Sequence, residues 1–226
     1  MGTTVQSVER AFSILETFDE QHPSRTAADI AATSGLARPT TYRMLQTLRR
    51  LGYIRSVGGR FEVTPRVLHL AAGYLGRESL AARAQSVLDS LSEQLGEHVA
   101  LGVLDGDEVI AVAASNSPQS RFLAVAVQVG QRLPADRTSL GRVLLAHQAN
   151  TFDEESQAIR DAGFVLTDGL LETGLRSVGV PVRDHTGEVV AALSVAVNAV
   201  RVSTEQLEQE CLPLLRTASD EISAVI

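Results

Sequence analysis

The chain has 226 residues, of which 44% are hydrophobic and 21% are charged, and its formal net charge at pH 7 is -7. This composition excludes an intrinsically disordered chain, and no apolar run approaches the roughly 18 residues of a membrane-spanning helix, so we expect a cytoplasmic protein without membrane contact. One cysteine cannot form an internal disulfide, and the five dispersed histidines give no close pair of the kind that zinc sites use, so we expect neither metal nor cofactor.

Charge is distributed unevenly along the chain. Residues 1–76 contain nine arginines and six acids, whereas residues 77–226 contain eleven arginines and 21 acids. The stretch from Arg38 to Arg60 contains six arginines and no acid. Such a segment within an acidic chain indicates a polyanionic partner, and this asymmetry is typical of a nucleic-acid-binding module joined to a second domain. The alternative is a solvated basic face that has no partner.

The first part of the chain has the pattern of a winged helix-turn-helix. Apolar residues at helical spacing predict three helices, over residues 5–18, 27–33 and 38–51. Thr26 is a good N-cap for the second helix, Gly35 ends it, and Pro39 is acceptable in the first turn of the third. The stretch YIRSVGGRFEVT then predicts a two-stranded hairpin with Gly58 and Gly59 at its tip.

The third helix has an outer face suited to DNA. Arginine can bind guanine through two hydrogen bonds, glutamine can bind adenine, and hydroxyls can bind phosphate. Thr41 shares the apolar face with Leu45 and Leu48, but we include it with the outer residues as a candidate. The residues expected to contact double-stranded operator DNA are Arg38, Thr40, Thr41, Tyr42, Arg43, Gln46, Arg49 and, on the hairpin, Arg60.

The second part of the chain alternates between helical and strand patterns. Amphipathic helices are predicted over residues 64–75, 79–96, 139–147, 154–162 and 204–226. Strands are predicted on both sides of turns at Asp105-Gly106 and Thr186-Gly187, and within residues 121–130. This order predicts an α+β domain with a mostly antiparallel sheet. We expect a DNA-binding domain over residues 1–63, a linker helix over 64–76 and a second domain over 77–226.

Five motifs in order give the chain a resemblance to a known family. SVERAFSILETF, GLARPTTYRMLQTLRRLGYI, LPADRTSLGRVLLA, GLRSVGVPVRDHTGEVVAALSVAV and RVS resemble the IclR family of transcriptional regulators, over nearly the whole chain. LPADRTSLGRVLLA and ECLPLLRTASDEI are similar to the branch that regulates aromatic-acid and β-ketoadipate catabolism. The resemblance implies a homodimer or tetramer on pseudo-palindromic operators, with a GAF-like domain that binds a small organic acid. Repression and activation both stay open.

The resemblance also implies which residues line the effector pocket. They are Ser139, Leu140, Asp168, Ser177, Ser194 and Ala196, with Thr167 as an alternative to Asp168. Hydroxyls and helix N-terminal N–H groups donate toward a carboxylate, and Arg137 or Arg176 is a candidate for its charged partner. The sequence departs from the family pattern at residues 149–160, where members usually carry a longer loop and helix.

Two other functions are weaker readings of the same residues. Ser139, His147 and Asp168 could supply a hydrolase triad, but Ser139 and His147 are eight residues apart on one predicted helix. At 1.5 Å per residue their backbones would lie about 12 Å apart, which is too far for direct proton transfer. A purely architectural DNA-binding protein would leave the large apolar second domain unexplained. We therefore expect a regulator and not an enzyme.

Overall fold

The computed structural model describes residues 4–76, 79–117, 127–149, 151 and 153–226. Contacts between residues divide the chain into two units, Met1–Tyr74 and Leu75–Ile226, so the helix predicted over residues 64–75 belongs to the first unit. Within the described ranges, no helix combines the length and apolarity that crossing a membrane requires.

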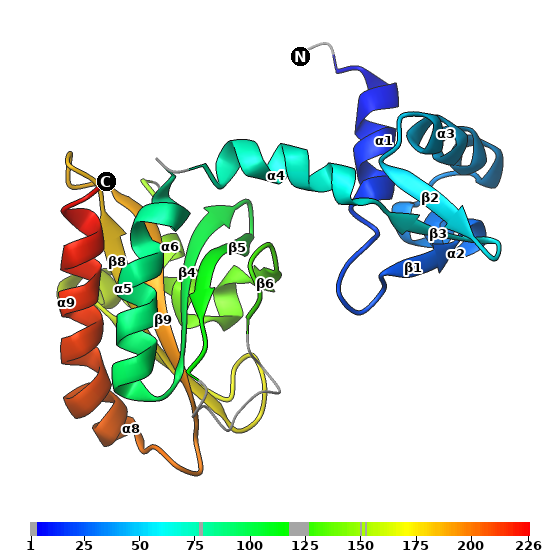
Figure 1. The fold of residues 1–226 in the computed structure, drawn as a ribbon. Coiled ribbons are helices and arrows are strands. Elements are labelled where there is room, and N and C mark those ends of the chain that lie inside the picture. The colour runs from blue at the N-terminus through cyan, green and yellow to red at the C-terminus, as the bar shows by residue number, and fades with distance from the viewer. Residues whose placement is uncertain (1–3, 77–78, 118–126, 150, 152) are drawn as a thin grey trace. The chain divides into compact units, whose positions relative to one another are not determined.

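The first unit is a three-helix domain with a small antiparallel sheet and one further helix (Figure 1). Its helices are α1 (Gln6–Leu15), α2 (Ala27–Ser34), α3 (Arg38–Arg50) and α4 (Leu68–Tyr74). Its strands are β1 (Ser24–Thr26), β2 (Ile54–Val57) and β3 (Arg60–Val63), in the order β1-β3-β2. The core consists of Ile14, Ile30, Leu45, Leu48, Ile54 and Phe61.

Local signals in the sequence place these elements. Thr26 caps α2 through a capping box, in which its hydroxyl accepts from the Asp29 N–H while the Asp29 carboxylate accepts from the Thr26 N–H. Gly35 ends α2 with φ of 68°, the left-handed region that favours glycine. Gly58 and Gly59 form the hairpin tip with φ of 57° and 81°, as a tight turn with two positive φ values requires. The winged helix-turn-helix prediction is confirmed.

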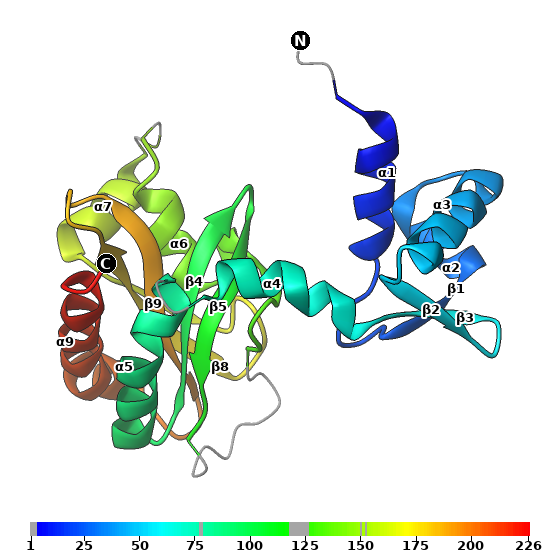
Figure 2. The same ribbon diagram turned by 45° about the horizontal axis from the view of Figure 1, so that its top comes forward.

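The second unit is a six-stranded antiparallel sheet with helices on both faces (Figure 2). The strands are β4 (His98–Asp105), β5 (Glu108–Ser115), β6 (Arg132–Pro134), β7 (Val165–Asp168), β8 (Leu175–Arg183) and β9 (Val189–Asn198), in the order β6-β5-β4-β9-β8-β7. The helices are α5 (Leu80–Leu95), α6 (Ser139–Ala146), α7 (Glu154–Ala162), α8 (Thr204–Gln206) and α9 (Leu212–Ser223). Helices α5 and α9 cover one face, and α6 and α7 cover the other. The α+β prediction is confirmed.

The two faces of the sheet differ in side-chain size. Val99 and Leu101 pack toward α5 and α9, whereas Ala100 between them packs toward α6, as the two-residue period of a strand dictates. Small residues on the face that α6 covers let this helix approach the sheet closely. A Cβ on Gly179 would lie 2.7 Å from the Ser139 carbonyl oxygen, so β8 needs glycine where the first turn of α6 crosses it. This close approach positions the start of α6 over the sheet.

Three features of the second unit differ from the sequence prediction. The short strands β6 and β7 were not predicted, and most of the strand predicted over residues 121–130 lies outside the described residues. The helix predicted over residues 204–226 is divided by a π-helical segment, Leu207–Cys211. Pro213 follows this segment and has no N–H to bond the carbonyl four residues earlier, which is a sufficient reason for the irregular hydrogen bonding.

Candidate functional site

The outer face of α3 presents unpaired cations. Arg38, Arg43 and Arg49 are exposed, and none of their guanidinium groups forms an ion pair or hydrogen bond with a described residue. Tyr42 beside them is 56% exposed, and Thr40 and Gln46 are half-buried on the same face. Three free guanidinium groups on one face of a helix can bind phosphate or base edges without first breaking an internal interaction.

Thr41 requires a correction. Its exposed fraction is 0%, and its hydroxyl donates to the Ala37 carbonyl oxygen at 3.3 Å, within the first turn of α3. The Thr41 hydroxyl is therefore hydrogen-bonded within its own helix, and the side chain faces the core that contains Leu45 and Leu48. The prediction that Thr41 contacts DNA is wrong, because the helical period places it on the inner face.

The wing carries two arginines that are already bonded. Arg55 on β2 pairs with Glu62 on β3 at 2.8 Å, so its charge is largely compensated. Arg60 on β3 donates to the Ser24 backbone carbonyl at 2.6 Å and to the Ser24 hydroxyl at 3.1 Å, and thereby joins β3 to β1. Arg60 keeps its full charge because its partners are neutral, and it is exposed. Only Arg60 of these two can add net positive charge to a DNA-facing surface.

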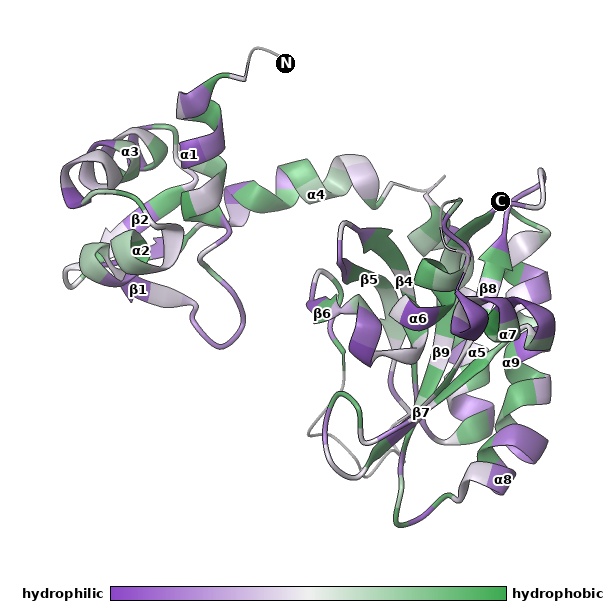
Figure 3. Ribbon diagram, turned by 180° about the vertical axis from the view of Figure 1, so that it is seen from behind, coloured by the Kyte–Doolittle hydropathy of each residue, from purple (hydrophilic) through white to green (hydrophobic). Residues whose placement is uncertain are grey.

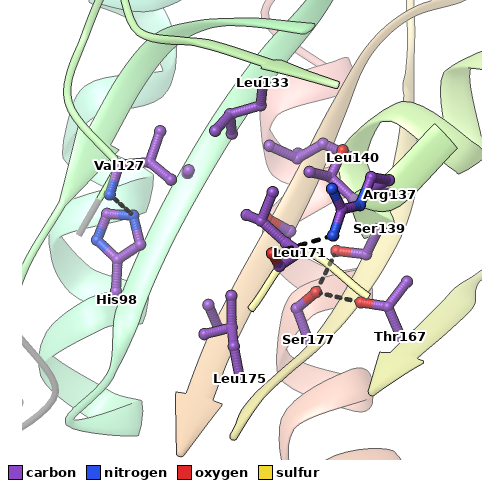
Figure 4. Close-up of a pocket in the computed structure, with 14 residues that line it drawn as sticks. His98, Val127, Leu133, Arg137, Ser139, Leu140, Thr167, Leu171, Leu175 and Ser177 are labelled. Carbon is purple, nitrogen blue, oxygen red and sulfur yellow. Dashed lines mark hydrogen bonds between the residues drawn. The ribbon is translucent and has the colours of Figure 1, made fainter. Parts of the chain in front are cut away.

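A pocket between the sheet and the start of α6 holds five of the six predicted effector residues (Figure 4). Including its opening to solvent, its volume is about 460 Å³. The five are Ser139, Leu140, Ser177, Ser194 and Ala196. The other lining residues are His98, Ala100, Val127, Leu133, Arg137, Thr138, Thr167, Leu171 and Leu175.

The register of the sheet explains why residues so far apart in the sequence meet. Neighbouring strands pair in order, which produces two rows of side chains on the face that α6 covers. The first row, from β4 to β7, is His98, Ala196, Ser177 and Thr167. The second row, from β4 to β8, is Ala100, Ser194 and Gly179. In the first row Ala196 therefore separates His98 from the hydroxyls of Ser177 and Thr167, and in the second row Ser194 places a hydroxyl between two small residues.

Three hydroxyls form a chain at one end of the pocket. Thr167 and Ser177 lie 2.7 Å apart, and Ser177 donates to the Ser139 hydroxyl at 2.8 Å. Because each hydroxyl has one proton, Ser177 can donate to Ser139 only if Thr167 donates to Ser177. The Ser139 proton is then available to a ligand at the first turn of α6. The N-terminal end of a helix also favours negative charge, so this end suits a carboxylate.

Ser194 supplies a hydroxyl with no internal partner. The residue is only 6% exposed, and its hydroxyl forms no hydrogen bond with any residue that the structure describes. The hydroxyl faces the pocket, where water or a ligand can reach it. Since Ser194 lines the pocket, a ligand is the natural partner for this hydroxyl.

Only one of the two candidate arginines lies at the pocket. Arg137 lines it, is exposed, and donates through Nε and Nη2 to the Leu170 carbonyl oxygen at 2.9 Å and 2.6 Å. Arg176 instead donates to the Val202 carbonyl and pairs with Asp168. Asp168, which the sequence analysis named as an effector residue, is exposed and does not line this pocket. Successive strand residues point to opposite faces, which brings Thr167 into the pocket and turns Asp168 away from it.

The sequence analysis missed His98, which lines the opposite end of the pocket from the hydroxyl chain (Figure 4). His98 is 4% exposed; its Nε2 accepts from the Val127 N–H at 3.2 Å, and its Nδ1 bonds the Asn116 side-chain oxygen. A backbone N–H can only donate, so Nε2 is unprotonated and the neutral ring carries its proton on Nδ1. Burial lowers the pKa of His98 and favours this neutral form. The sequence held one signal for this role. His98 begins an apolar strand and lies two residues before Ala100, so both side chains point to the same face of the sheet.

The hydrolase arrangement does not form. The Ser139 hydroxyl is bonded to Ser177, and Asp168 is bonded to Arg176. His147 donates from Nδ1 to the Val143 carbonyl at 2.8 Å, and its Nε2 lies 3.4 Å from a nitrogen of Arg183. Burial and the neighbouring arginines lower its pKa. These three side chains therefore have separate partners and do not connect a nucleophile to a base.

Comparisons with known proteins bear on both regions. A family model for the IclR helix-turn-helix domain matches residues 7–58, and a model for the C-terminal domain of the bacterial transcriptional regulator IclR matches residues 72–157 and 148–224. The two C-terminal matches overlap inside the segment where the sequence departs from the family pattern. Together the models match most of the chain.

Three relatives share nearly the full length. The Pca regulon regulatory protein of Pseudomonas putida is 36% identical over 240 residues, covering 96% of this chain and 82% of that protein. The p-hydroxybenzoate hydroxylase transcriptional activator of Acinetobacter baylyi is 30% identical and covers 98% of this chain and 92% of that protein. An IclR homolog from Microbacterium hydrocarbonoxydans, crystallised with 4-hydroxybenzoate, is 25% identical with a TM-score of 0.76, covering 97% of this chain and 98% of that chain.

Proposed function

The chain belongs to the IclR family of bacterial transcriptional regulators, and we propose that it binds operator DNA as a homodimer, or as a tetramer of two such dimers. We propose further that its second domain binds a small carboxylic acid, aromatic or dicarboxylic, and that this acid controls a catabolic operon. One observation carries the proposal of a ligand. It is the hydroxyl of Ser194, which has no partner among the described residues, inside a pocket that also holds the Ser177–Ser139 hydroxyl chain.

DNA binding is assigned to the outer face of α3 and the wing. Arg38, Arg43 and Arg49 supply charge that no described residue neutralises. Arg43 lies in the N-terminal half of α3, the part of a recognition helix that contacts base edges, and we assign base contact to it. Arg60 on the wing is assigned to phosphate. Thr40, Tyr42 and Gln46 complete the proposed surface.

A dimer follows from the reach of one recognition helix. Such a helix covers a few base pairs, whereas two helices related by a two-fold axis bind half-sites about one helical turn apart, or a multiple of it. The contact is assigned to apolar residues of the first unit that are between 51% and 64% exposed: Val5, Val8, Phe12, Leu68, Leu70 and Tyr74. The last three belong to α4, which is largely hydrophobic in Figure 3. Sedimentation that finds a monomer with full operator affinity at micromolar concentration would contradict this assignment.

The charges and hydrogen-bond donors of the pocket support the proposal of an acid. Arg137 is the only charged residue among the described lining residues, so the pocket attracts an anion locally although the domain as a whole is acidic. Ser139 and Ser194 offer hydroxyl donors, and Nη1 of Arg137 is not used by the Leu170 carbonyl. Leu133, Leu140, Leu171 and Leu175 supply an apolar surface for the body of the ligand.

A thermal-shift screen of mono- and dicarboxylic acids tests the proposed ligand class. An acid at a hundredfold excess over its Kd should raise the free energy of unfolding by about 2.7 kcal/mol. Ser194→Leu, which fills the floor of the pocket, is the matched control and should not respond. The proposal fails if no acid stabilises the unmodified protein, or if the same acids stabilise Ser194→Leu equally.

A further inference from the structure

Two adjacent arginines end α3, and the structure separates them by direction. Arg49 and Arg50 are both exposed, and neither guanidinium group bonds a described residue. The C-terminal end of a helix favours cations in its last turn, but this effect is the same for both residues. The sequence analysis named only Arg49 as a candidate DNA contact. The two side chains differ in direction, because successive residues of an α-helix are about 100° apart around its axis.

The buried residues of α3 define its inner side. Leu45 is fully buried, and Thr41 and Leu48 lie within about 60° of it around the helix axis. Arg49 follows Leu45 by four residues, so its direction is only about 40° from that of Leu45. Arg50 follows Leu45 by five residues and lies about 140° from it. Arg50 therefore points away from the core, whereas Arg49 points along the edge of the inner side.

Arg50 shares its direction with Arg43. The two residues are seven apart, which is nearly two full turns, so their directions differ by about 20° and their backbones lie about 10.5 Å apart along the axis. Gln46 lies between them along the helix and within about 60° of both directions. Arg43, Gln46 and Arg50 therefore form one row on the side of α3 that faces away from the core.

The position of Arg50 at the end of α3 favours the DNA backbone as its partner. The N-terminal part of a recognition helix contacts base edges, while the C-terminal end of such a helix contacts the backbone. A guanidinium group without an internal partner can form two parallel hydrogen bonds to a phosphate. Arg55, the next cation along the chain, is already paired with Glu62. Arg50 therefore has the free charge that a phosphate contact at this end of the helix requires.

We infer that Arg50, rather than Arg49, holds a phosphate of the DNA backbone at the C-terminal end of α3. This inference rests on the proposed function and adds a contact that fixes the position of the recognition helix on the duplex. A phosphate contact contains no sequence information, so it strengthens binding to all duplex DNA equally. Arg43, at the other end of the row, keeps the base contact.

Salt-dependent gel shifts with two matched variants test the inference. Arg50→Ala and Arg49→Ala remove the same charge from neighbouring exposed positions, so they change the long-range field of the full-length protein almost equally. The probes are DNA selected from a random library by the unmodified protein and a scrambled duplex of the same length and composition, each at 50 and 200 mM salt.

Arg50→Ala should weaken binding to both duplexes by the same factor. The slope of log affinity against log salt concentration should become shallower by about 0.9 per bound protomer. The ratio of the unmodified affinity to the variant affinity should therefore fall about 3.5-fold per protomer between the two salt concentrations. Arg49→Ala should have the smaller effect on both affinity and slope.

Two further variants identify the kind of contact. Arg50→Lys keeps a point charge that binds phosphate, so it should recover most of the slope and affinity that Arg50→Ala loses. Arg43→Ala should instead reduce the preference for the selected DNA over the scrambled duplex, because it removes a base contact.

The outcomes separate this inference from the proposed function. If Arg49→Ala weakens binding as much as Arg50→Ala, or if Arg50→Ala weakens binding to the selected DNA alone, the assignment of Arg50 to phosphate is refuted while the proposed base contact of Arg43 stands. If Arg43→Ala, Arg49→Ala and Arg50→Ala all bind the selected DNA as tightly as the unmodified protein, the proposed DNA interface itself is wrong. A loss in Arg50→Ala that both duplexes share, that exceeds the loss in Arg49→Ala and that Arg50→Lys restores supports the inference.

Discussion

Ser194→Ala should weaken acid binding without weakening the fold. Ser194 is 6% exposed, and its hydroxyl has no partner among the described residues, so its removal breaks none of the hydrogen bonds that the structure describes. Because the hydroxyl lines the pocket and can be hydrated there, its loss should leave the free energy of unfolding nearly unchanged. A bond from this hydroxyl to a carboxylate contributes about 1.5–3 kcal/mol, which corresponds to roughly 10- to 150-fold in Kd.

Ser177→Ala is the matched control, because it removes the same hydroxyl group from a serine whose hydroxyl does form internal hydrogen bonds. The Ser177 hydroxyl bonds both Thr167 and Ser139, so its removal should lower the free energy of unfolding by about 2 kcal/mol at roughly 1 kcal/mol per bond. That loss should lower the Tm by about 4–8 °C in a domain of this size. Urea unfolding without ligand and calorimetric titration with acid measure the two effects separately. If Ser194→Ala destabilises the protein as much as Ser177→Ala, Ser194 has a structural role and the reasoning fails.

Other expected outcomes concern DNA, packing and pH. Arg43→Ala should cost about 1–3 kcal/mol in operator affinity and relax the preference at one base position; Arg55→Ala, which removes an arginine already paired with Glu62, should cost less in the same gel shifts. Gly179→Ala places a Cβ 2.7 Å from the Ser139 carbonyl oxygen, so it should destabilise the protein by about 1–3 kcal/mol in urea, whereas Gly73→Ala has no atom within 4 Å of its Cβ and should not. The lowered pKa of His98 means that the unfolded chain binds a proton at higher pH than the folded one. Stability should therefore be complete above about pH 6.5 and fall as the pH drops below it. His147 acts in the same direction, so His98→Gln should remove part of this decline in unfolding experiments at pH 5 and pH 7.

The sequence alone predicted the secondary structure correctly where cap and turn residues determine it. Thr26 and Asp29 define the start of α2, and Gly58 and Gly59 define the hairpin tip, so the winged helix was predictable from cap and turn residues alone. Thr41 was placed wrongly among the DNA contacts because its residue type suggested phosphate binding. Its position on the helix, in phase with Leu45 and Leu48, was the better guide.

The pocket depends on long-range pairing, which no local pattern contains. The serines were grouped through the family resemblance, and the register of β4, β9 and β8 is what places them on one face. His98 was missed because its significance depends on Ala196 and Ser177, which lie about 80 to 100 residues further along the chain. The sequence left Asp168 and Thr167 as alternatives, and the two-residue period of β7 decides which of them faces the pocket.

The central claim is that an acid in the second domain controls operator binding by the first. Its most direct test is the operator Kd measured by gel shift, with and without a saturating concentration of the acid that the thermal-shift screen identifies, on DNA selected from a random library by the unmodified protein. We predict that the acid changes this Kd for the unmodified protein, and that Ser194→Leu binds the same operator with unchanged affinity and no response to the acid. An operator Kd that responds to the acid equally in Ser194→Leu would contradict the account, because the filled pocket could not then be the site through which the acid acts.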